Sequence, residues 1–164
     1  MFGPLGQDVD GEAAQDFAGS SVALNAAGNR MIVGAYGNDG AGGTAGHARI
    51  YEWNGTNWNQ LGADIDGEAA GDQSGWSVAM SGNGNRVIVG ARFNDGNNSN
   101  SGQVRMYQWS GSAWVQMGAD IDGESALDQF GYAVSMNDAG DRIAVGAINN
   151  DGNNSNSGHV RIYS

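Results

Sequence analysis

The strongest constraint on this chain is an internal repeat of 56 residues that runs through the sequence without an insertion or deletion. Gly6, Gly62 and Gly118 mark the same point in three consecutive units. Such a period predicts a repeat architecture, in which each unit buries its apolar faces against its neighbours. We therefore expect a single repeat domain that covers the 164 residues. The units cover approximately residues 5–60, 61–116 and 117–164.

Composition narrows the class of protein further. Glycine is abundant, at 29 of 164 residues, but it recurs in phase with the repeat and alternates with Val, Ile, Met and Trp, which indicates turns between strands and not disorder. The formal net charge is −11, and a chain this acidic repels phosphate backbones, so we expect no nucleic-acid partner. No apolar run approaches the roughly 20 residues of a membrane span, so we expect no membrane insertion. Residues 1–4 are not a secretory leader, so an export signal would lie outside this sequence.

One unit contains four strand signals and no helix signal. In the central unit these are the alternating run 75–80, the continuous β-branched run 86–91, the alternating run 103–109 and the short run 113–118. Clusters of Gly, Asn and Ser separate them, as expected for hairpins. Four antiparallel strands per unit predict a blade of a β-propeller. Both faces of a blade pack on neighbouring blades, which explains why the second strand has no polar face.

Two segments of the third unit resemble a known repeat family. Asp128–Gln129–Phe130–Gly131–Tyr132–Ala133–Val134–Ser135, followed by Val145–Gly146–Ala147, resembles the FG-GAP repeat of integrin α-like β-propellers. The other units keep shorter forms, Ala18–Gly19 with Gly34–Ala35 and Ser74–Gly75 with Gly90–Ala91. The resemblance implies a β-propeller used for extracellular recognition or adhesion.

The 56-residue register also suggests how the ring closes. Residues 1–6 correspond to the fourth strand of a unit, and Ser164 corresponds to the end of a third strand. Because unpaired strand edges invite pairing, we expect the N-terminal segment to supply the closing fourth strand. Propellers usually have about 4 to 8 blades, which favours a homodimer that closes a six-bladed ring. Two alternatives remain open, an excised fragment of a larger propeller and a self-closed three-fold monomer.

Strand order places the long connections on one edge of the sheets and the short hairpins on the other. We call the first edge the acidic rim; in the central unit it consists of residues 64–73 and 92–101. Asp64, Asp66 and Glu68, with Asp72, occupy positions 1, 3, 5 and 9 of a loop, a spacing that lets side chains converge on Ca²⁺. The candidate metal ligands are Asp8, Asp10, Glu12, Asp16, Asp64, Asp66, Glu68, Asp72, Asp120, Asp122, Glu124 and Asp128.

The resemblance supports this spacing only in part. Integrin-type FG-GAP loops use the same spacing, but the glycine here stands at position 4 instead of 6. The loop also precedes the first strand of the unit, whereas the calcium loop of the family lies between the first and second strands.

A structural alternative explains the same carboxylates without a metal. Asp64 and Asp66 would cap tight turns through their own side chains. Asp72 would pair with Arg86 or Arg105, and Asp95 is open to the same pairing. The Asn-Asp-Gly sequences favour turn formation over metal binding at Asp39, Asp95 and Asp151. In this interpretation Arg86 and Arg105 satisfy carboxylates or stack on Tyr107 and Trp109.

Other chemistry-bearing residues point away from catalysis. His47 and His159 are equivalent, but the middle unit has Gln103 in their place, so a histidine base is not retained. Neither a nucleophile paired with a base nor a phosphate-binding loop is present. The tryptophans flank the hairpins between third and fourth strands, where cross-strand packing is favoured over stacking on sugars. They are Trp53, Trp58, Trp109 and Trp114.

These observations predict a non-enzymatic extracellular or cell-surface binding or adhesion module. Its acidic rim would recognise a protein or glycan, with Ca²⁺ as the candidate cofactor. The alternative function is a structural self-assembly unit that forms rings or filaments through strand exchange.

Overall fold

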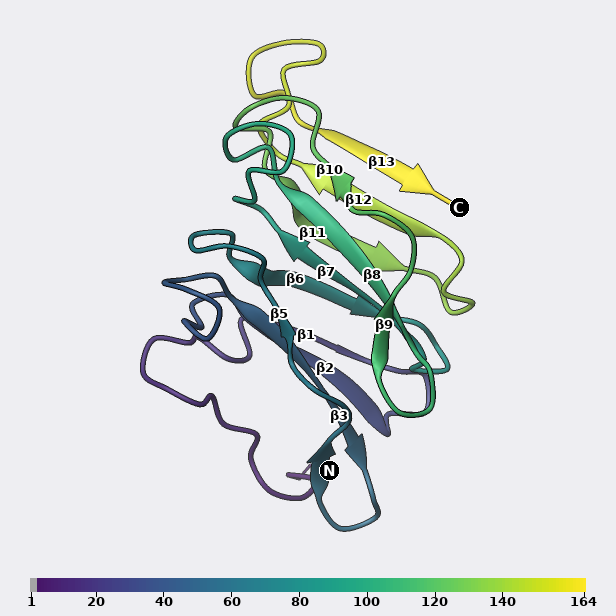
Figure 1. Ribbon diagram of the computed structural model, residues 1–164. Helices are drawn as coiled ribbons and strands as arrows, with labels where there is room; N and C mark the ends of the chain where they lie inside the picture. Colours follow the sequence, from purple (N-terminus) through teal and green to yellow (C-terminus); the bar gives the residue numbers. More distant parts are fainter. Residues whose placement is uncertain (1–2) are drawn as a thin grey trace.

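The computed structural model describes residues 3–164, which form 13 β-strands in three antiparallel sheets (Figure 1). The first sheet contains β1 (Ser21–Leu24), β2 (Arg30–Ala35), β3 (His47–Trp53), β4 (Trp58–Gln60) and β5 (Ile65–Asp66). The middle sheet contains β6 (Ser74–Met80), β7 (Arg86–Ala91), β8 (Gln103–Trp109), β9 (Trp114–Gln116) and β10 (Ile121–Asp122). The third contains β11 (Phe130–Met136), β12 (Ile143–Ala147) and β13 (His159–Tyr163). The all-β, antiparallel prediction is confirmed.

The first three strands of the unit lie where the sequence predicted them. In the middle sheet β6 begins one residue before the predicted run 75–80, and β7 and β8 match 86–91 and 103–109. A bulge between Ser74 and Ser77 opens β6, where Gly75 adopts a φ of 82°. Because a residue with a side chain is strained at this φ, glycine suits the bend.

The fourth strand is shorter than predicted and is divided into two pieces. The sequence predicted one strand over 113–118, whereas β9 and β10 pair separately with β8. Gly118 lies between the two pieces with a φ of 72°, which turns the chain before it returns to the edge of β8. The first sheet repeats this arrangement with β4 and β5 on β3, and Gly62 has a φ of 83°. Positive φ at these glycines explains why one continuous strand does not form.

Two apolar layers hold the three sheets together. Ile32 and Ile50 of the first sheet pack with Val78 and Val87 of the middle sheet in one layer. Ile88 points to the other side and packs with residues of the third sheet. Strand β7 therefore buries both of its faces, as the β-branched run predicted, because alternate residues serve different layers.

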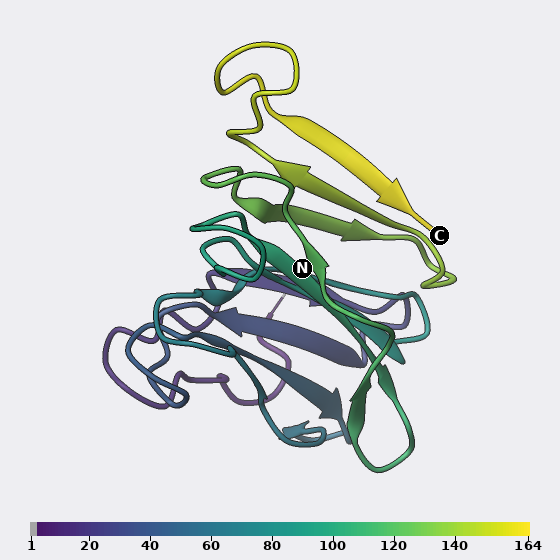
Figure 2. The same cartoon turned by 45° about the horizontal axis from the view of Figure 1, so that its top comes forward.

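The sheets follow one another in a row, and the first and third lie on opposite sides of the middle sheet (Figures 1 and 2). Strands β1 and β2 pack on β6, and β11 packs on β6 and β7. The self-closed three-fold arrangement is therefore not the one adopted. Within residues 3–164, there is no helix with the length and apolar character that a membrane crossing requires.

The N-terminal segment follows the first sheet without forming a strand there. Residues 1–2 of the predicted closing strand lie outside the described residues, and residues 3–6 are irregular. The carbonyl of Leu5 accepts a hydrogen bond from the Trp58 indole at 3.0 Å. One unit later the carbonyl of Leu61 accepts the same bond from Trp114 at 2.8 Å. Leu5 therefore occupies the place that the repeat register gives it, and ring closure by this segment stays a prediction.

Candidate functional site: the acidic rim

The long connections of successive units lie side by side along one edge of the sheets. The Gly71 amide donates to the carbonyl of Gly43 at 2.9 Å, and the Gln73 amide donates to that of Thr44 at 3.1 Å. The next pair of units repeats the contact, with the Leu127 amide donating to the carbonyl of Ser99 at 2.9 Å. The loops between second and third strands project together at this edge (Figure 1). The sequence therefore placed the acidic rim correctly.

The last acidic position of each connection is buried and holds the rim in shape. Asp72 is 4 % exposed, and its Oδ2 accepts hydrogen bonds from the Ala69 amide at 3.0 Å and from Asn94 Nδ2 at 2.9 Å. The equivalents Asp16 and Asp128 make the same contacts with Asn38 and Asn150. The predicted pairing of Asp72 with Arg86 or Arg105 is wrong, because the asparagine of the neighbouring loop satisfies this carboxylate.

The Asn-Asp-Gly aspartates form turns, as predicted. Asp39, Asp95 and Asp151 accept a hydrogen bond from an amide five residues later, each at 2.6 Å. These contacts close the tips of the loops between second and third strands. The pairing of Asp95 with an arginine is therefore wrong.

The first unit gathers an ion-pair cluster from two connections. Arg49 presents Nε and Nη2 to the carboxylate of Asp64 at 3.1 and 3.2 Å, which is the two-pronged geometry typical of arginine and carboxylate. The same guanidinium forms an ion pair with Glu12, which belongs to the preceding connection. Gln60 adds a bond from Nε2 to Asp64 at 2.6 Å. Asp64 therefore binds side chains here instead of capping a turn.

His47 lies inside this cluster and was not predicted to be part of it. Its ring is buried, and Nδ1 lies 3.6 Å from Asp64 Oδ2 and 4.0 Å from Asp66 Oδ1. Within residues 3–164, Glu12, His47 and Asp64 form the group whose possible ligand atoms all lie within 4.8 Å of one another. Among the described residues, these three side chains can present ligand atoms to one cation.

The structure does not bring Asp64, Asp66, Glu68 and Asp72 of one connection together around a point. Asp72 points to Asn94, Asp64 points back to Arg49, and Glu68 accepts from Gln103 Nε2 at 3.1 Å. Each connection thus divides its carboxylates between two units. Sequence spacing missed this division because the partners come from strands β3 and β8 and from the loop that contains Asn94. Calcium binding stays a prediction.

In the second and third units, the arginines equivalent to Arg49 make different contacts. Arg105 lies 3.7 Å from Glu68, and its Nη2 donates to the carbonyl of Asp66 at 2.6 Å. It also stacks over Tyr107, at 5.8 Å from the ring centre, so the predicted role of Arg105 is confirmed. In the third unit Arg161 pairs with Glu124, and this hydrogen bond raises the pKa of Arg161.

Arg86 does not follow the prediction that it satisfies a carboxylate or stacks on an aromatic ring. Its Nη1 donates to the carbonyl of Gly140 at 3.0 Å, in the hairpin of the next sheet. Arg30 makes the equivalent contact with Gly84. These arginines fasten the hairpin edge of one sheet to that of the next.

A row of aromatic side chains crosses the acidic rim, and sequence reasoning missed it. Phe17 stacks on Tyr36 with ring centres 5.1 Å apart, and Tyr36 lies 4.8 Å from Trp76. Trp76 in turn lies 5.6 Å from Tyr132. We call these four residues the aromatic row. They are half-exposed or exposed, and they come from three units, so only the shared position of Trp76 and Tyr132 in the repeat could have indicated the row.

Arg92 completes the aromatic row as a cation. Its guanidinium carbon lies 3.2 Å from the centre of the Trp76 ring, and Nε donates to Gln73 Oε1 at 2.9 Å. Burial lowers the pKa of Arg92, while Tyr132 and Tyr36 oppose the shift. The aromatic row and Arg92 together form a partly exposed, partly apolar surface that carries one positive charge beside the carboxylates of the rim.

The hairpin tryptophans pack across strands, as predicted. Trp53 is paired with Trp58 at 5.5 Å between ring centres, and Trp109 is paired with Trp114 at 5.4 Å. They lie at the hairpins between third and fourth strands, on the edge opposite the rim.

Comparison with known proteins agrees with this architecture. Residues 63–107 and 120–163 match the family model of the FG-GAP repeat, and the two matches together cover more than half of the chain. Among solved structures, the chain is similar to hydrazine synthase from Kuenenia stuttgartiensis, with a TM-score of 0.48 and 8 % identity. That alignment covers 88 % of this chain and 32 % of the other, so this chain spans about a third of its length. No curated protein sequence matches this chain.

Proposed function

This chain belongs to the FG-GAP repeat family, and we propose that it is a non-enzymatic binding module whose acidic rim recognises a protein or glycan partner with the help of Ca²⁺. FG-GAP repeats are typically binding or adhesion modules of extracellular and cell-surface proteins, and they are generally non-enzymatic. We infer an extracellular or cell-surface location for this chain as well.

The observation that carries the proposal is the contrast between the two edges of the sheets. The rim combines ion-pair clusters, exposed carboxylates and the aromatic row on long connections, whereas the hairpin edge consists of short turns whose tryptophans are paired with each other across strands. Binding sites concentrate on loops that a rigid scaffold holds in place. Partly exposed aromatic side chains beside carboxylates suit a glycan, since the exposed parts of the rings can contact the apolar face of a sugar and the carboxylates accept hydrogen bonds from its hydroxyls. The aromatic row therefore favours a glycan among the partners.

The proposed ligands of Ca²⁺ are Glu12 and Asp64. Both carboxylates already pair with Arg49, so Ca²⁺ that binds there must displace the guanidinium. This competition lowers affinity, and we expect dissociation constants of about 10⁻⁴ to 10⁻³ M, the range of extracellular calcium modules. Extracellular calcium would occupy such a site.

Calorimetric titration of metal-stripped protein with CaCl₂ tests the cation. We expect heat and a rise in melting temperature in wild type, and loss of both in the double variant Glu12→Gln/Asp64→Asn. Asp141→Asn, which removes an exposed carboxylate on the hairpin edge, is the matched control and should retain the response. Absence of any heat or thermal shift in wild type at millimolar Ca²⁺ rejects the calcium part of the proposal.

A glycan array probed with and without Ca²⁺ tests the partner. Trp76→Ala in the aromatic row should abolish binding of any glycan that wild type retains. Trp109→Ala, which removes a tryptophan at the opposite edge, should leave that binding intact once circular dichroism shows the variant to be folded. Equal loss in both variants, or an array on which wild type retains nothing, rejects glycan recognition by the rim.

A further inference from the structure

At each end of the row of sheets, exposed apolar residues occupy repeat positions whose equivalents between the sheets are buried. Val78 and Met80 of β6 face the first sheet and are 6 and 7 % exposed. Their equivalents in β1, Val22 and Leu24, are 62 and 60 % exposed. We call the surface around these two residues the head face.

At the opposite end, β13 shows the other half of the same interface. Ala48 and Ile50 of β3 face the middle sheet and are 0 % exposed. Their equivalents in β13 are Val160 and Ile162, which are 69 and 74 % exposed. We call the surface around these two residues the tail face. Head and tail are therefore complementary, because each interior contact joins a head-type surface to a tail-type surface.

Backbone contacts give this complementarity a definite register. At both interior contacts a glycine of the second strand touches a glycine carbonyl of the next sheet so closely that an added Cβ would overlap it, Gly34 with Gly75 and Gly90 with Gly131. The equivalent Gly146 on the tail face has its nearest neighbours 3.8 Å from such a Cβ, and Gly19 on the head face has none within 4 Å. Each end thus carries one unpaired half of the same close contact.

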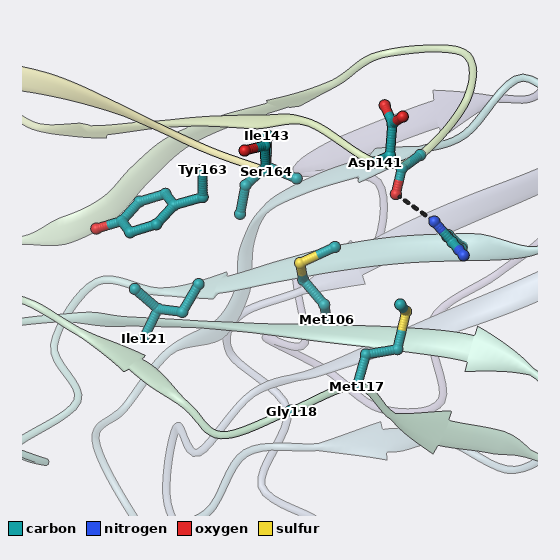
Figure 3. Close-up of a pocket in the computed structure, with 10 residues that line it drawn as sticks. Met106, Met117, Gly118, Ile121, Asp141, Ile143, Tyr163 and Ser164 are labelled. Atoms are coloured by element: carbon teal, nitrogen blue, oxygen red, sulfur yellow. Dashed lines mark hydrogen bonds between the residues drawn. The ribbon is translucent and has the colours of Figure 1, made fainter.

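A cavity lies between the middle and third sheets (Figure 3). It has a volume of about 510 Å³, and Met106, Met117, Ile121 and Tyr163 are among the residues that line it. The equivalent place between the first and middle sheets holds Trp114, whose indole bonds to the carbonyl of Leu61.

Leu5 lies where a chain that enters the first sheet from a neighbouring unit would pass, because its carbonyl accepts the Trp58 indole as the Leu61 carbonyl accepts that of Trp114.

Within the described residues, the ion-pair cluster of the third unit has one carboxylate fewer around Arg161 than the first unit has around Arg49. Arg49 pairs with Glu12 and with Asp64, which the next unit supplies, and its side chain is 12 % exposed. Arg161 pairs with Glu124, and its side chain is 43 % exposed. The residue equivalent to Asp64 would be Asp8 of a following unit.

We propose that the tail face of one copy of this chain binds the head face of a second copy, and that two copies close a ring of six repeats. In this arrangement Gly19 of the second copy lies against Gly146 of the first, and Asp8 of the second copy lies beside the guanidinium of Arg161. The interface is head-to-tail, and such interfaces form closed rings when the rotation between copies allows it. Six repeats fall within the usual range of about 4 to 8 blades. This inference does not depend on the ligand of the rim.

Sedimentation velocity over a wide range of concentrations tests the assembly. We expect a species of twice the 16.9 kDa chain mass that does not grow further. Gly146→Ala should raise the dissociation constant of this dimer by about tenfold or more, since overpacking a close contact costs about 1 to 3 kcal/mol. Gly43→Ala, at a glycine with open space around it, should leave the dimer intact. A wild type that is monomeric at all concentrations, or one that grows without limit, overturns the proposal.

Mixing variants distinguishes a head-to-tail contact from a face that pairs with itself. Leu24→Glu blocks the head face and Ile162→Glu blocks the tail face, so each variant alone should be monomeric. Their mixture retains one intact head and one intact tail, and should form a dimer. Failure of the mixture to associate when both variants are folded, or normal dimerisation of either variant alone, overturns the proposal.

Cross-linking tests the register directly. In the first sheet Ile65 lies opposite Ala48, and in the middle sheet Ile121 lies opposite Val104. The equivalent pair across two copies is Val9 and Val160, and the chain contains no cysteine of its own. Oxidation of the double variant Val9→Cys/Val160→Cys should give a covalent dimer on a denaturing gel, and Val9→Cys/Val115→Cys, in which the second cysteine lies on β9 of the middle sheet and outside the tail face, should not. Equal cross-linking of both variants overturns the register.

Discussion

The middle and third sheets follow the same repeat pattern, yet their third strands differ in burial. Val104 in β8 is 0 % exposed, whereas the equivalent Val160 in β13 is 69 % exposed. On the side that faces the preceding sheet the two agree, since Val89 and Val145 are 1 and 0 % exposed. The largest exposures, at Val160 and Ile162, lie on the face that a following sheet would cover. Burial in this repeat is thus a property of the contact between neighbours, as expected for a stack in which each unit touches only the next.

We expect the largest difference in unfolding free energy when the equivalent isoleucine is truncated once on a covered and once on an uncovered sheet face. Ile50→Ala should lower the free energy of unfolding by about 2 to 5 kcal/mol, because it leaves a cavity between the first and middle sheets. Ile162→Ala should change it by less than about 0.5 kcal/mol in the monomer, because this side chain is already in water. Urea unfolding at a protein concentration that keeps the chain monomeric measures both values.

Val104→Ala and Val160→Ala provide an independent pair at the neighbouring position of the same strands. The contrast should have the same sign and a smaller size, since valine contributes less apolar surface than isoleucine. A similar loss for Ile50→Ala and Ile162→Ala would mean that the tail face is covered in the monomer.

A second comparison adds a methyl group instead of removing one. Gly90→Ala forces a Cβ against the Gly131 carbonyl and should destabilise the monomer by about 1 to 3 kcal/mol. Gly146→Ala has open space and should leave the stability of the monomer unchanged or raise it by up to about 1 kcal/mol, because alanine restricts the unfolded chain more than glycine does. Thermal unfolding of the two variants at low concentration measures the difference. Equal destabilisation would show that strand geometry, and not the neighbouring sheet, requires the glycine.

Much of this fold could be predicted from the sequence because the same pattern is written three times. The strands 86–91 and 103–109, the hairpins and the rim follow from alternation, β-branched runs and turn residues. The broken fourth strand could not be predicted in the same way. Gly118 reads equally as a strand end or a bend, and only the pairing of β10 with β8 decides between them.

The site was harder to predict than the fold. Spacing within one connection suggested that Asp64, Asp66, Glu68 and Asp72 act together, but the groups that bind them belong to other strands and loops. Asp64 pairs with Arg49 of the preceding unit, and Asp72 accepts a hydrogen bond from the buried side chain of Asn94. Contacts that join units depend on the angle between sheets, which a local pattern does not encode.

A third comparison asks whether the buried aspartates depend on neighbouring sheets. Asp72→Ala removes the acceptor of two hydrogen bonds, and Asp128→Ala removes the same contacts in the third unit. Each should cost about 1 to 3 kcal/mol, because the Asn side chain and a loop amide lose their partner. The two losses should be equal, since both partners come from the unit itself. Asp141→Ala on the exposed hairpin is the control and should stay within about 0.5 kcal/mol. A much smaller loss at Asp128 in urea unfolding would show that the third unit is less well formed than the middle one.

The smallest expected effect concerns Tyr107, which the contact between the first two sheets buries. Burial raises the pKa of its phenol above the usual value of 10.0, although Arg105 opposes the shift. In the unfolded chain the phenol keeps its usual pKa, so the unfolded state loses the proton first as pH rises. The stability that Tyr107 contributes is therefore fully present below pH 10 and is lost as pH rises through the folded-state pKa. The chain has neither lysine nor cysteine, so tyrosines are the side chains that titrate in this window. Unfolding free energies should fall more steeply above pH 10 in wild type than in Tyr107→Phe, and identical slopes would show that this phenol reaches solvent through opening of the interface.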